Sequence, residues 1–171
     1  MFDLSPATWC DTFVSTQPVS ISSFEFMFRP AAMPIASQAD IRHVLRLARE
    51  YGWQFDRQRL QTFLRNPVHV ILLTDAQQRI QFVSQGFSRL TGYEPDEALG
   101  KSPAFLQGNE TSPETKQRIK TDLRSRNLFK GDLLNYRKNG ETYWCHVEIL
   151  PLHDTTNTIT HYMAFEWEVA S

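Results

Sequence analysis

From about residue 66 onward, apolar and polar positions follow the pattern of β-strands. An apolar run at residues 68–74 and a second strand-like stretch at 80–84 flank the turn Asp75-Ala76-Gln77-Gln78, which predicts a hairpin. Three further strand-like stretches follow, at residues 129–137, 143–151 and 159–169. The dipeptide Asn139-Gly140 predicts a second hairpin between the first two of these. We therefore expect five strands.

Short helices are expected between the two groups of strands. Residues 86–90 and 95–99 are each followed by a glycine that can end a helix, and Thr111-Ser112-Pro113-Glu114 opens a longer helix that runs to about residue 126. Two strands, several helices and three strands cannot form a parallel βαβ series. This order predicts an α+β fold, in which short helices cover one face of a five-stranded antiparallel sheet.

The first 65 residues are expected to form an extension that contains two short helices. Asp40 can cap a helix over residues 40–51 that ends at Gly52, and Asp56 can start a second helix over 56–65. The apolar stripe of the first helix consists of Ile41, Val44, Leu45 and Ala48. Alternating phenylalanines at 24, 26 and 28 predict a short strand. These apolar groups are expected to dock on the sheet or on a second subunit.

Composition narrows the class of protein. A chain of 171 residues has room for one sizeable core, and its net charge of −1 gives no overall sign of a nucleic-acid partner. No apolar run approaches the roughly 18 residues that span a bilayer, so we expect a cytoplasmic protein without a membrane partner. The two cysteines and five histidines form no metal-binding motif, and no catalytic motif is present, which argues against an enzyme.

Two longer phrases carry a family resemblance. The stretches FVSQGFSRLTGYEPDEALGKSP at 82–103 and LLNYRKNGETYWCHVEILPL at 133–152 resemble the PAS family, and the match defines a domain over residues 66–171. Within that family, FLQG at 105–108 and LNY at 134–136 are most similar to the light-oxygen-voltage (LOV) subgroup. The resemblance implies a sheet that cups a ligand beneath short helices.

The resemblance also identifies a candidate pocket. Pro103 stands where LOV sensors keep the cysteine that forms a flavin adduct, so adduct photochemistry is not expected. The candidate pocket residues are Gln107, Lys120, Asn135, Cys145, Val147, Ile149, Ala164 and Glu166. Gln107 and Asn135 match polar positions of the subgroup, whereas Lys120 replaces an arginine and Glu166 replaces a glutamine. Bound FMN or FAD stays an open alternative.

These observations predict a stand-alone sensory or protein-interaction PAS protein. We expect a homodimer that binds a small-molecule ligand and acts on an effector protein in trans through changed contacts. One alternative is a flavin-binding photosensor or redox sensor that works without a cysteine adduct. Another is a DNA-binding regulator, for which the basic residues of the two N-terminal helices are Arg42, Arg46, Arg49, Arg57, Arg59 and Arg65. Solvated arginines on amphipathic helices are the commoner explanation of that pattern.

Overall fold

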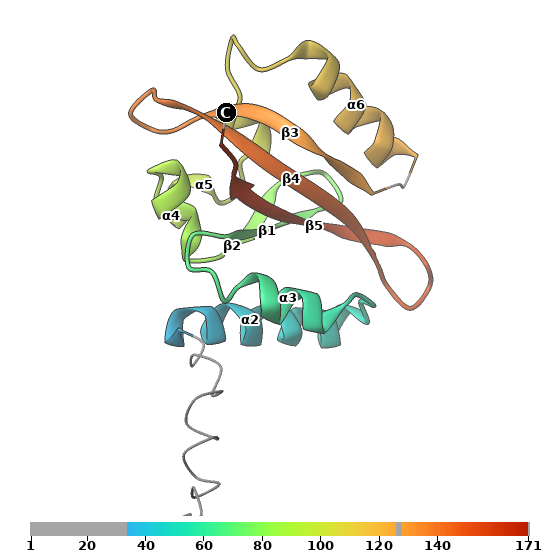
Figure 1. The fold of residues 1–171 in the computed structure, drawn as a ribbon. Coiled ribbons are helices and arrows are strands. Elements are labelled where there is room, and N and C mark those ends of the chain that lie inside the picture. The colour runs from blue at the N-terminus through green and yellow to red at the C-terminus, as the bar shows by residue number, and fades with distance from the viewer. Residues whose placement is uncertain (1–33, 126–127, 171) are drawn as a thin grey trace, which may run out of the picture. The chain divides into compact units, whose positions relative to one another are not determined.

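The structure, a computed structural model, describes residues 34–125 and 128–170, which belong to one compact unit. Its centre is an antiparallel sheet of five strands in the order β2-β1-β5-β4-β3 (Figure 1). The strands are β1 (Val70–Asp75), β2 (Ile80–Val83), β3 (Phe129–Tyr136), β4 (Thr142–His153) and β5 (Ile159–Glu168). The predicted α+β fold is therefore confirmed, while the predicted strand at residues 24–28 lies outside the described residues.

Four short helical segments cover one face of the sheet, here called the inner face. They are α4 (Gly86–Thr91), α5 (Pro95–Ala98), the 3-10 turn η1 (Pro103–Leu106) and α6 (Pro113–Arg124). Gly92 ends α4 in the left-handed conformation at φ 75°, as the sequence pattern predicts. The hydroxyl of Ser112 accepts a hydrogen bond from the backbone N–H of Thr115 at 3.1 Å and so caps α6.

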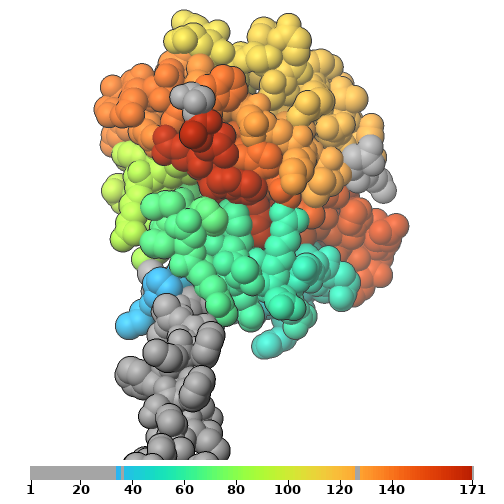
Figure 2. All heavy atoms as spheres, viewed as in Figure 1, coloured from blue at the N-terminus to red at the C-terminus, as the bar shows by residue number. Residues whose placement is uncertain are grey.

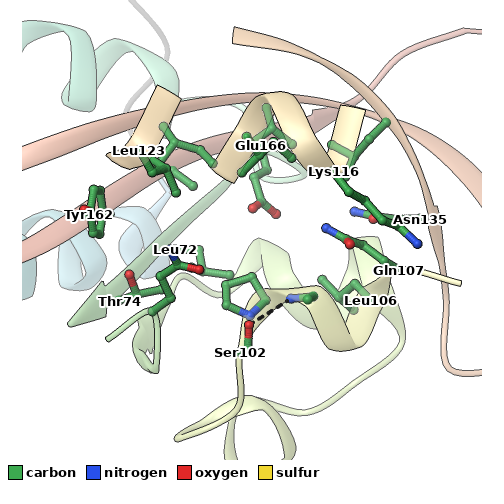
Figure 3. A pocket seen from close by; sticks show the side chains of 18 of the residues that line it. Leu72, Thr74, Ser102, Leu106, Gln107, Lys116, Leu123, Asn135, Tyr162 and Glu166 are labelled. Carbon is green, nitrogen blue, oxygen red and sulfur yellow. Dashed lines mark hydrogen bonds between the residues drawn. The ribbon is translucent and has the colours of Figure 1, made fainter. Parts of the chain in front are cut away.

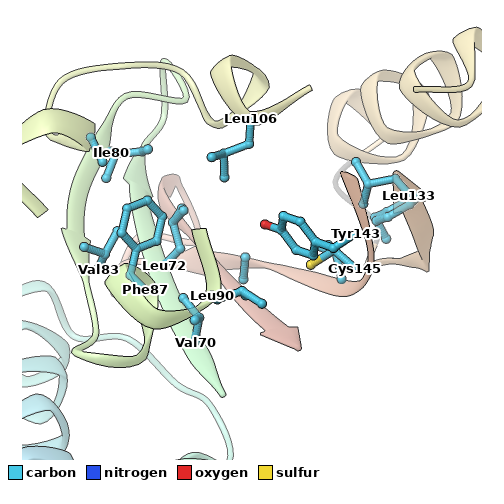
Figure 4. Close-up of a cluster of buried hydrophobic side chains, with 14 residues drawn as sticks. Val70, Leu72, Ile80, Val83, Phe87, Leu90, Leu106, Leu133, Tyr143 and Cys145 are labelled. Atoms are coloured by element: carbon cyan, nitrogen blue, oxygen red, sulfur yellow. The ribbon is translucent and has the colours of Figure 1, made fainter. Parts of the chain in front are cut away.

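The inner face holds a closely packed apolar cluster (Figure 4). Tyr143, Cys145 and Val147 contribute to it from β4, because alternate residues of a strand share one face. Phe87 of α4 and Leu106 of η1 close the cluster from the helical side.

The opposite, outer face is covered by α2 (Ile35–Tyr51) and α3 (Arg57–Phe63). Val44 and Leu60 of these helices pack with Ile71, Met163 and Phe165 of the sheet in a second apolar cluster. In the space-filling view, atoms of the helical layer lie directly against the red atoms of β5 (Figure 2). The two helices therefore share a core with the sheet, so the expected docking of the apolar stripe is confirmed for α2.

The start of the first helix needs a correction. Helix α2 begins at Ile35, five residues before Asp40, with Pro34 at its N-cap and no side-chain cap hydrogen bond. Asp40 lies inside the helix, where its carboxylate accepts a hydrogen bond from the backbone N–H of Gln85 at 3.1 Å. That contact satisfies the Asp40 side chain without a cap and ties α2 to the start of α4. Gly52 ends the helix at φ 74°, as predicted.

Candidate functional site

A cavity of about 210 Å³ lies between the inner face of the sheet and the segments η1 and α6 (Figure 3). Its apolar lining comes from β1, β3, β4 and β5 on one side and from η1 and α6 on the other: Leu72, Leu133, Val147, Ile149, Ala164, Pro103, Ala104, Leu106, Ile119 and Leu123. The wall is mostly apolar, and only a few polar groups reach it.

Glu166 of β5 is the most unusual polar group of the cavity. Its residue is 5 % exposed, and its side chain points into the cavity (Figure 3). Within the described residues, Oε2 of this carboxyl group has no hydrogen-bond partner. Burial raises the pKa of Glu166 to about 7, because desolvation disfavours the charged form. The group is therefore partly protonated near neutral pH.

Asn135 of β3 brings a second buried polar group to the cavity. It is 4 % exposed and lies opposite Tyr143 of β4 in the strand register. Burial raises the pKa of Tyr143. The nearby Asn135 side chain lowers this pKa, but by less than burial raises it. Neither Asn135 Oδ1 nor Tyr143 Oη has a hydrogen-bond partner in the part of the chain that the structure describes. The hydroxyl of Thr74 on β1 lines the cavity and is unpartnered in the same sense.

Two lysines of α6 line the same cavity. Lys116 and Lys120 are one helical turn apart on the face of the helix that also carries Ile119 and Leu123. Lys116 Nζ donates a hydrogen bond to the carbonyl oxygen of Gly108 at 3.1 Å. Lys120 is exposed, and no ion pair to it exists among the described residues. The cavity thus has a buried carboxyl group at Glu166 and an exposed cation at its edge.

The structure brings most of the predicted pocket residues together. Those that line the cavity are Gln107, Lys120, Asn135, Val147, Ile149, Ala164 and Glu166. Cys145 is not among its lining residues and lies in the apolar cluster of the inner face. Burial, and next to it the charge of Glu166, raises the pKa of the Cys145 thiol, which disfavours the reactive thiolate.

Sequence reasoning missed several lining residues: Thr74, Gln78, Ser102, Lys116 and Tyr162. Lys116 could have been found, since it precedes Lys120 by one turn and shares the helical stripe of Ile119 and Leu123. Gln78 has a positive φ of 60° in the turn after β1, and nothing in the local sequence shows that this turn reaches the cavity. Its place there depends on how the hairpin sits against η1.

Among residues 34–125 and 128–170, no three His, Cys, Asp or Glu side chains gather into a group that could hold a metal ion. No helix within these ranges is long and apolar enough to cross a membrane.

Comparison with known proteins gives the family. The model of the PAS domain family matches residues 67–166. The bacterioopsin transcriptional activator of Halobacterium salinarum is 33% identical over 97 residues, which are 57% of this chain and 14% of that protein. The blue-light-activated histidine kinase of Brucella canis is 34% identical over 90 residues, which are 53% of this chain and 18% of that protein. The chain therefore spans less than a fifth of the length of either relative.

Solved structures of LOV domains are also similar to this chain. The LOV domain of the blue-light photoreceptor Aureochrome1 in its light state is 34% identical, with a TM-score of 0.58 over 59% of this chain and 81% of that chain. The LOV domain of a blue-light activated histidine kinase from Erythrobacter litoralis is 25% identical, with a TM-score of 0.57 over 60% of this chain and 96% of that chain. With LOV domains among its neighbours and a family match over residues 67–166, this chain belongs to the PAS domain family.

Proposed function

We propose that this chain is a sensory PAS domain that binds a small molecule in its inner cavity and signals to an effector protein in trans, without adduct photochemistry. The observation that carries the proposal is the buried carboxyl group of Glu166, with an unpartnered oxygen, in a mostly apolar cavity. A buried polar atom left without a hydrogen bond costs about 1–3 kcal/mol. A ligand that supplies this bond is therefore favoured by the cavity.

Strand β5 offers a direct route from the cavity to the outer face. Glu166 lies between Phe165 and Trp167, whose side chains point to the opposite face because neighbouring residues of a strand alternate. The Phe165 ring contacts the ring of Phe63 on α3, with centroids 5.0 Å apart, and the Arg59 guanidinium lies 4.4 Å from the Phe165 centroid. A ligand that shifts Glu166 would therefore also change the contacts between β5 and α3.

Strand β4 offers a second route to the same helix. Glu148 lies between the cavity residues Val147 and Ile149 and forms ion pairs with Arg59 of α3 and with Lys130 of β3. Burial alone would raise the pKa of Glu148, but the hydrogen bonds from Lys130 and Arg59 lower it, so the carboxylate stays charged. Helix α3 is thus held by contacts to β4 and β5, two of the strands that line the cavity, and we infer that its position depends on whether the ligand is bound.

Flavin, the ligand that the LOV resemblance implies, fits these residues incompletely. Asn135 and Gln107 could bind the edge of a flavin ring, and the ring would supply light absorption and redox chemistry when bound. However, the phosphate would meet lysines in place of bidentate arginine, and Lys116 already donates to Gly108. The unpartnered Glu166 oxygen adds an acidic group beside the ring site. A flavin-binding sensor without an adduct is therefore the second candidate, favoured by the LOV neighbours alone.

The test is to identify what the purified protein carries. Native protein is denatured, and the released small molecules are measured by absorption and by mass spectrometry. The matched control is Ala164→Phe, which fills the cavity from β5; circular dichroism shows whether it folds. We expect a compound that is released from the wild type and is absent from the folded control. Equal release from both proteins, or none from either, would contradict ligand binding in this cavity.

Delivery in trans, a cytoplasmic location and the lack of catalysis stay predictions. So does the DNA-binding alternative, although the ion pair of Arg59 with Glu148 and the packing of α3 on the sheet reduce the basic surface free to meet DNA. A salt-dependent mobility shift with duplex DNA would be needed to revive that alternative.

A further inference from the structure

The unpartnered buried groups of the cavity share one property. Glu166 Oε2, Asn135 Oδ1 and Thr74 Oγ1 are all oxygens, all line the cavity, and all lack a hydrogen-bond partner within the described residues. A carboxylate and an amide oxygen only accept hydrogen bonds, and a hydroxyl can accept as well as donate. The sheet wall of the cavity therefore favours a ligand with hydrogen-bond donors.

The edge of the cavity carries positively charged side chains instead of oxygen acceptors. Lys120 is exposed and Lys116 is half-buried, whereas Glu166 and Asn135 are buried. The lysines extend from α6, while the oxygen acceptors belong to the sheet. A ligand in the cavity thus meets the buried carboxyl group of Glu166 on the sheet and the cation of Lys120 at the edge. Its affinity is highest if its hydrogen-bond donors can reach Glu166 while its acidic group reaches Lys120.

The volume of the cavity limits the size of the ligand. Pockets that enclose drug-sized molecules occupy roughly 300–1,000 Å³. The cavity here, at about 210 Å³, is smaller. A compact single-ring compound therefore suits it better than a tricyclic ring with a phosphorylated side chain.

We propose that the cavity selects a compact, planar ligand of the amidine or aminoheterocycle class, with paired N–H donors directed at Glu166 and an acidic group directed at Lys120. This ligand class rests on the proposed sensory function and narrows it. Two parallel N–H groups match the two oxygens of a carboxylate, which is the geometry that makes such pairs strong. A neutral amide of equal shape lacks one of these donors and leaves a buried oxygen unpaired.

The experiment compares two probes that differ in one group. The first is 4-amidinobenzoate, which carries an amidinium and a carboxylate; the second is 4-carbamoylbenzoate, which has the same shape with a neutral amide. Binding to the full chain is measured by calorimetry, with FMN as a third probe. We expect the amidine to bind at least about tenfold more tightly than the amide, since hydrogen bonds to charged groups are the stronger ones.

Matched variants assign the effect to each end of the cavity. Glu166→Gln keeps the size of the side chain, and we expect it to remove the preference for the amidine. Lys120→Met removes an exposed cation without an ion pair, and we expect it to weaken 4-amidinobenzoate while leaving benzamidine, which has no carboxylate, unchanged. Circular dichroism confirms that both variants fold, and the comparison of the two probes in wild-type protein does not depend on either variant.

The outcomes separate this inference from the proposed function. Equal or tighter binding of the amide or of FMN would overturn the ligand class and leave a ligand-sensing cavity in place. If no probe binds but a compound is released from wild-type protein and not from Ala164→Phe, the ligand class is again wrong. If no probe binds and no compound is released, the proposed function fails with it.

Discussion

At the scale of single residues, the conflict between burial and charge at Glu166 has a measurable consequence for stability. The pKa of this carboxyl group is raised from 4.5 to about 7 by burial, so the folded state holds the proton more tightly than the unfolded state. The charge of Glu166 contributes to the raised pKa of Tyr143 and of Cys145 on β4, and Lys116, Lys120 and Tyr162 are titratable residues that line the same cavity. The stabilisation from the proton is complete below pH 4.5 and is lost as the pH rises through about 7.

We therefore predict that ligand-free wild-type protein loses stability between pH 5 and pH 8 relative to Glu166→Gln, which cannot ionise. The difference should approach about 3 kcal/mol, from 1.36 kcal/mol for each pH unit between the two pKa values. Urea denaturation of both proteins at the two pH values measures it. A gap between the two proteins that stays constant with pH would show that Glu166 is solvated or paired in solution.

The cavity wall leads to a second prediction at this scale. Pro103 opens η1 at the wall, whereas the buried Cys145 thiol belongs to the apolar cluster and does not line the cavity. With excess FMN present, blue light should therefore not produce the reversible absorbance loss of a thiol adduct in wild-type protein. Pro103→Cys is the positive control, because it should form an adduct in whatever fraction carries flavin. A reversible adduct in wild type that Cys145→Ala abolishes would contradict the prediction.

At the scale of elements, the attachment of α3 to the sheet combines a buried apolar face with an ion pair. Asp56 caps the helix by accepting from the backbone N–H of Arg59 at 2.9 Å, and Leu60 is fully buried against the sheet. A helix of seven residues is too short to be stable alone in water, so these contacts to the sheet hold it.

We accordingly predict that Leu60→Ala lowers the free energy of unfolding by about 2–5 kcal/mol, the usual cost of deleting a fully buried leucine side chain. The control is Gln61→Ala, an exposed position of the same helix, which should change stability by less than about 0.5 kcal/mol. Urea denaturation of the three proteins gives both values. If Leu60→Ala behaves like its control, α3 does not dock on the sheet in solution.

At the scale of the whole molecule, the helices within the described residues cover the outer face only partly. Trp144 of β4 remains 41 % exposed, and Leu134 of β3 lies opposite it in the strand register. PAS domains commonly assemble through protein contacts, so we keep the homodimer as a prediction and place a second copy of the chain on this uncovered part. Exposed tryptophans are frequent anchors of such interfaces.

We therefore expect light scattering to give the mass of a dimer for the wild type and a lower mass for Trp144→Glu at the same concentration. Thr156→Glu, at an exposed position in the turn between β4 and β5, is the matched control and should stay dimeric. A monomer at high protein concentration in the wild type would rule out the homodimer. A dimer that survives Trp144→Glu would move the interface elsewhere.

The sequence by itself determined most of the secondary structure, and for β4 it also indicates which residues share a face. The hairpin glycine at position 140, the proline and serine that open α6 and the alternation of β4 act over a few residues, so they can be seen in the chain. The start of α2 could not be found in this way, because the Asp40 carboxylate can accept a hydrogen bond from either of two places in the chain. It can cap a helix, or it can accept from the distant Gln85, and only the packed structure decides between them.

Tertiary structure alone decided which residues share the cavity. Sequence and family resemblance indicated Asn135 and Glu166, but the placement of Thr74 and Lys116 at the same cavity, and of Cys145 outside its lining, depends on how η1 and α6 sit on the sheet. Whether a polar atom finds a partner also depends on groups that are far apart in the chain. Burial without a partner, the property that makes Glu166 a candidate binding group, therefore exists only in the folded molecule.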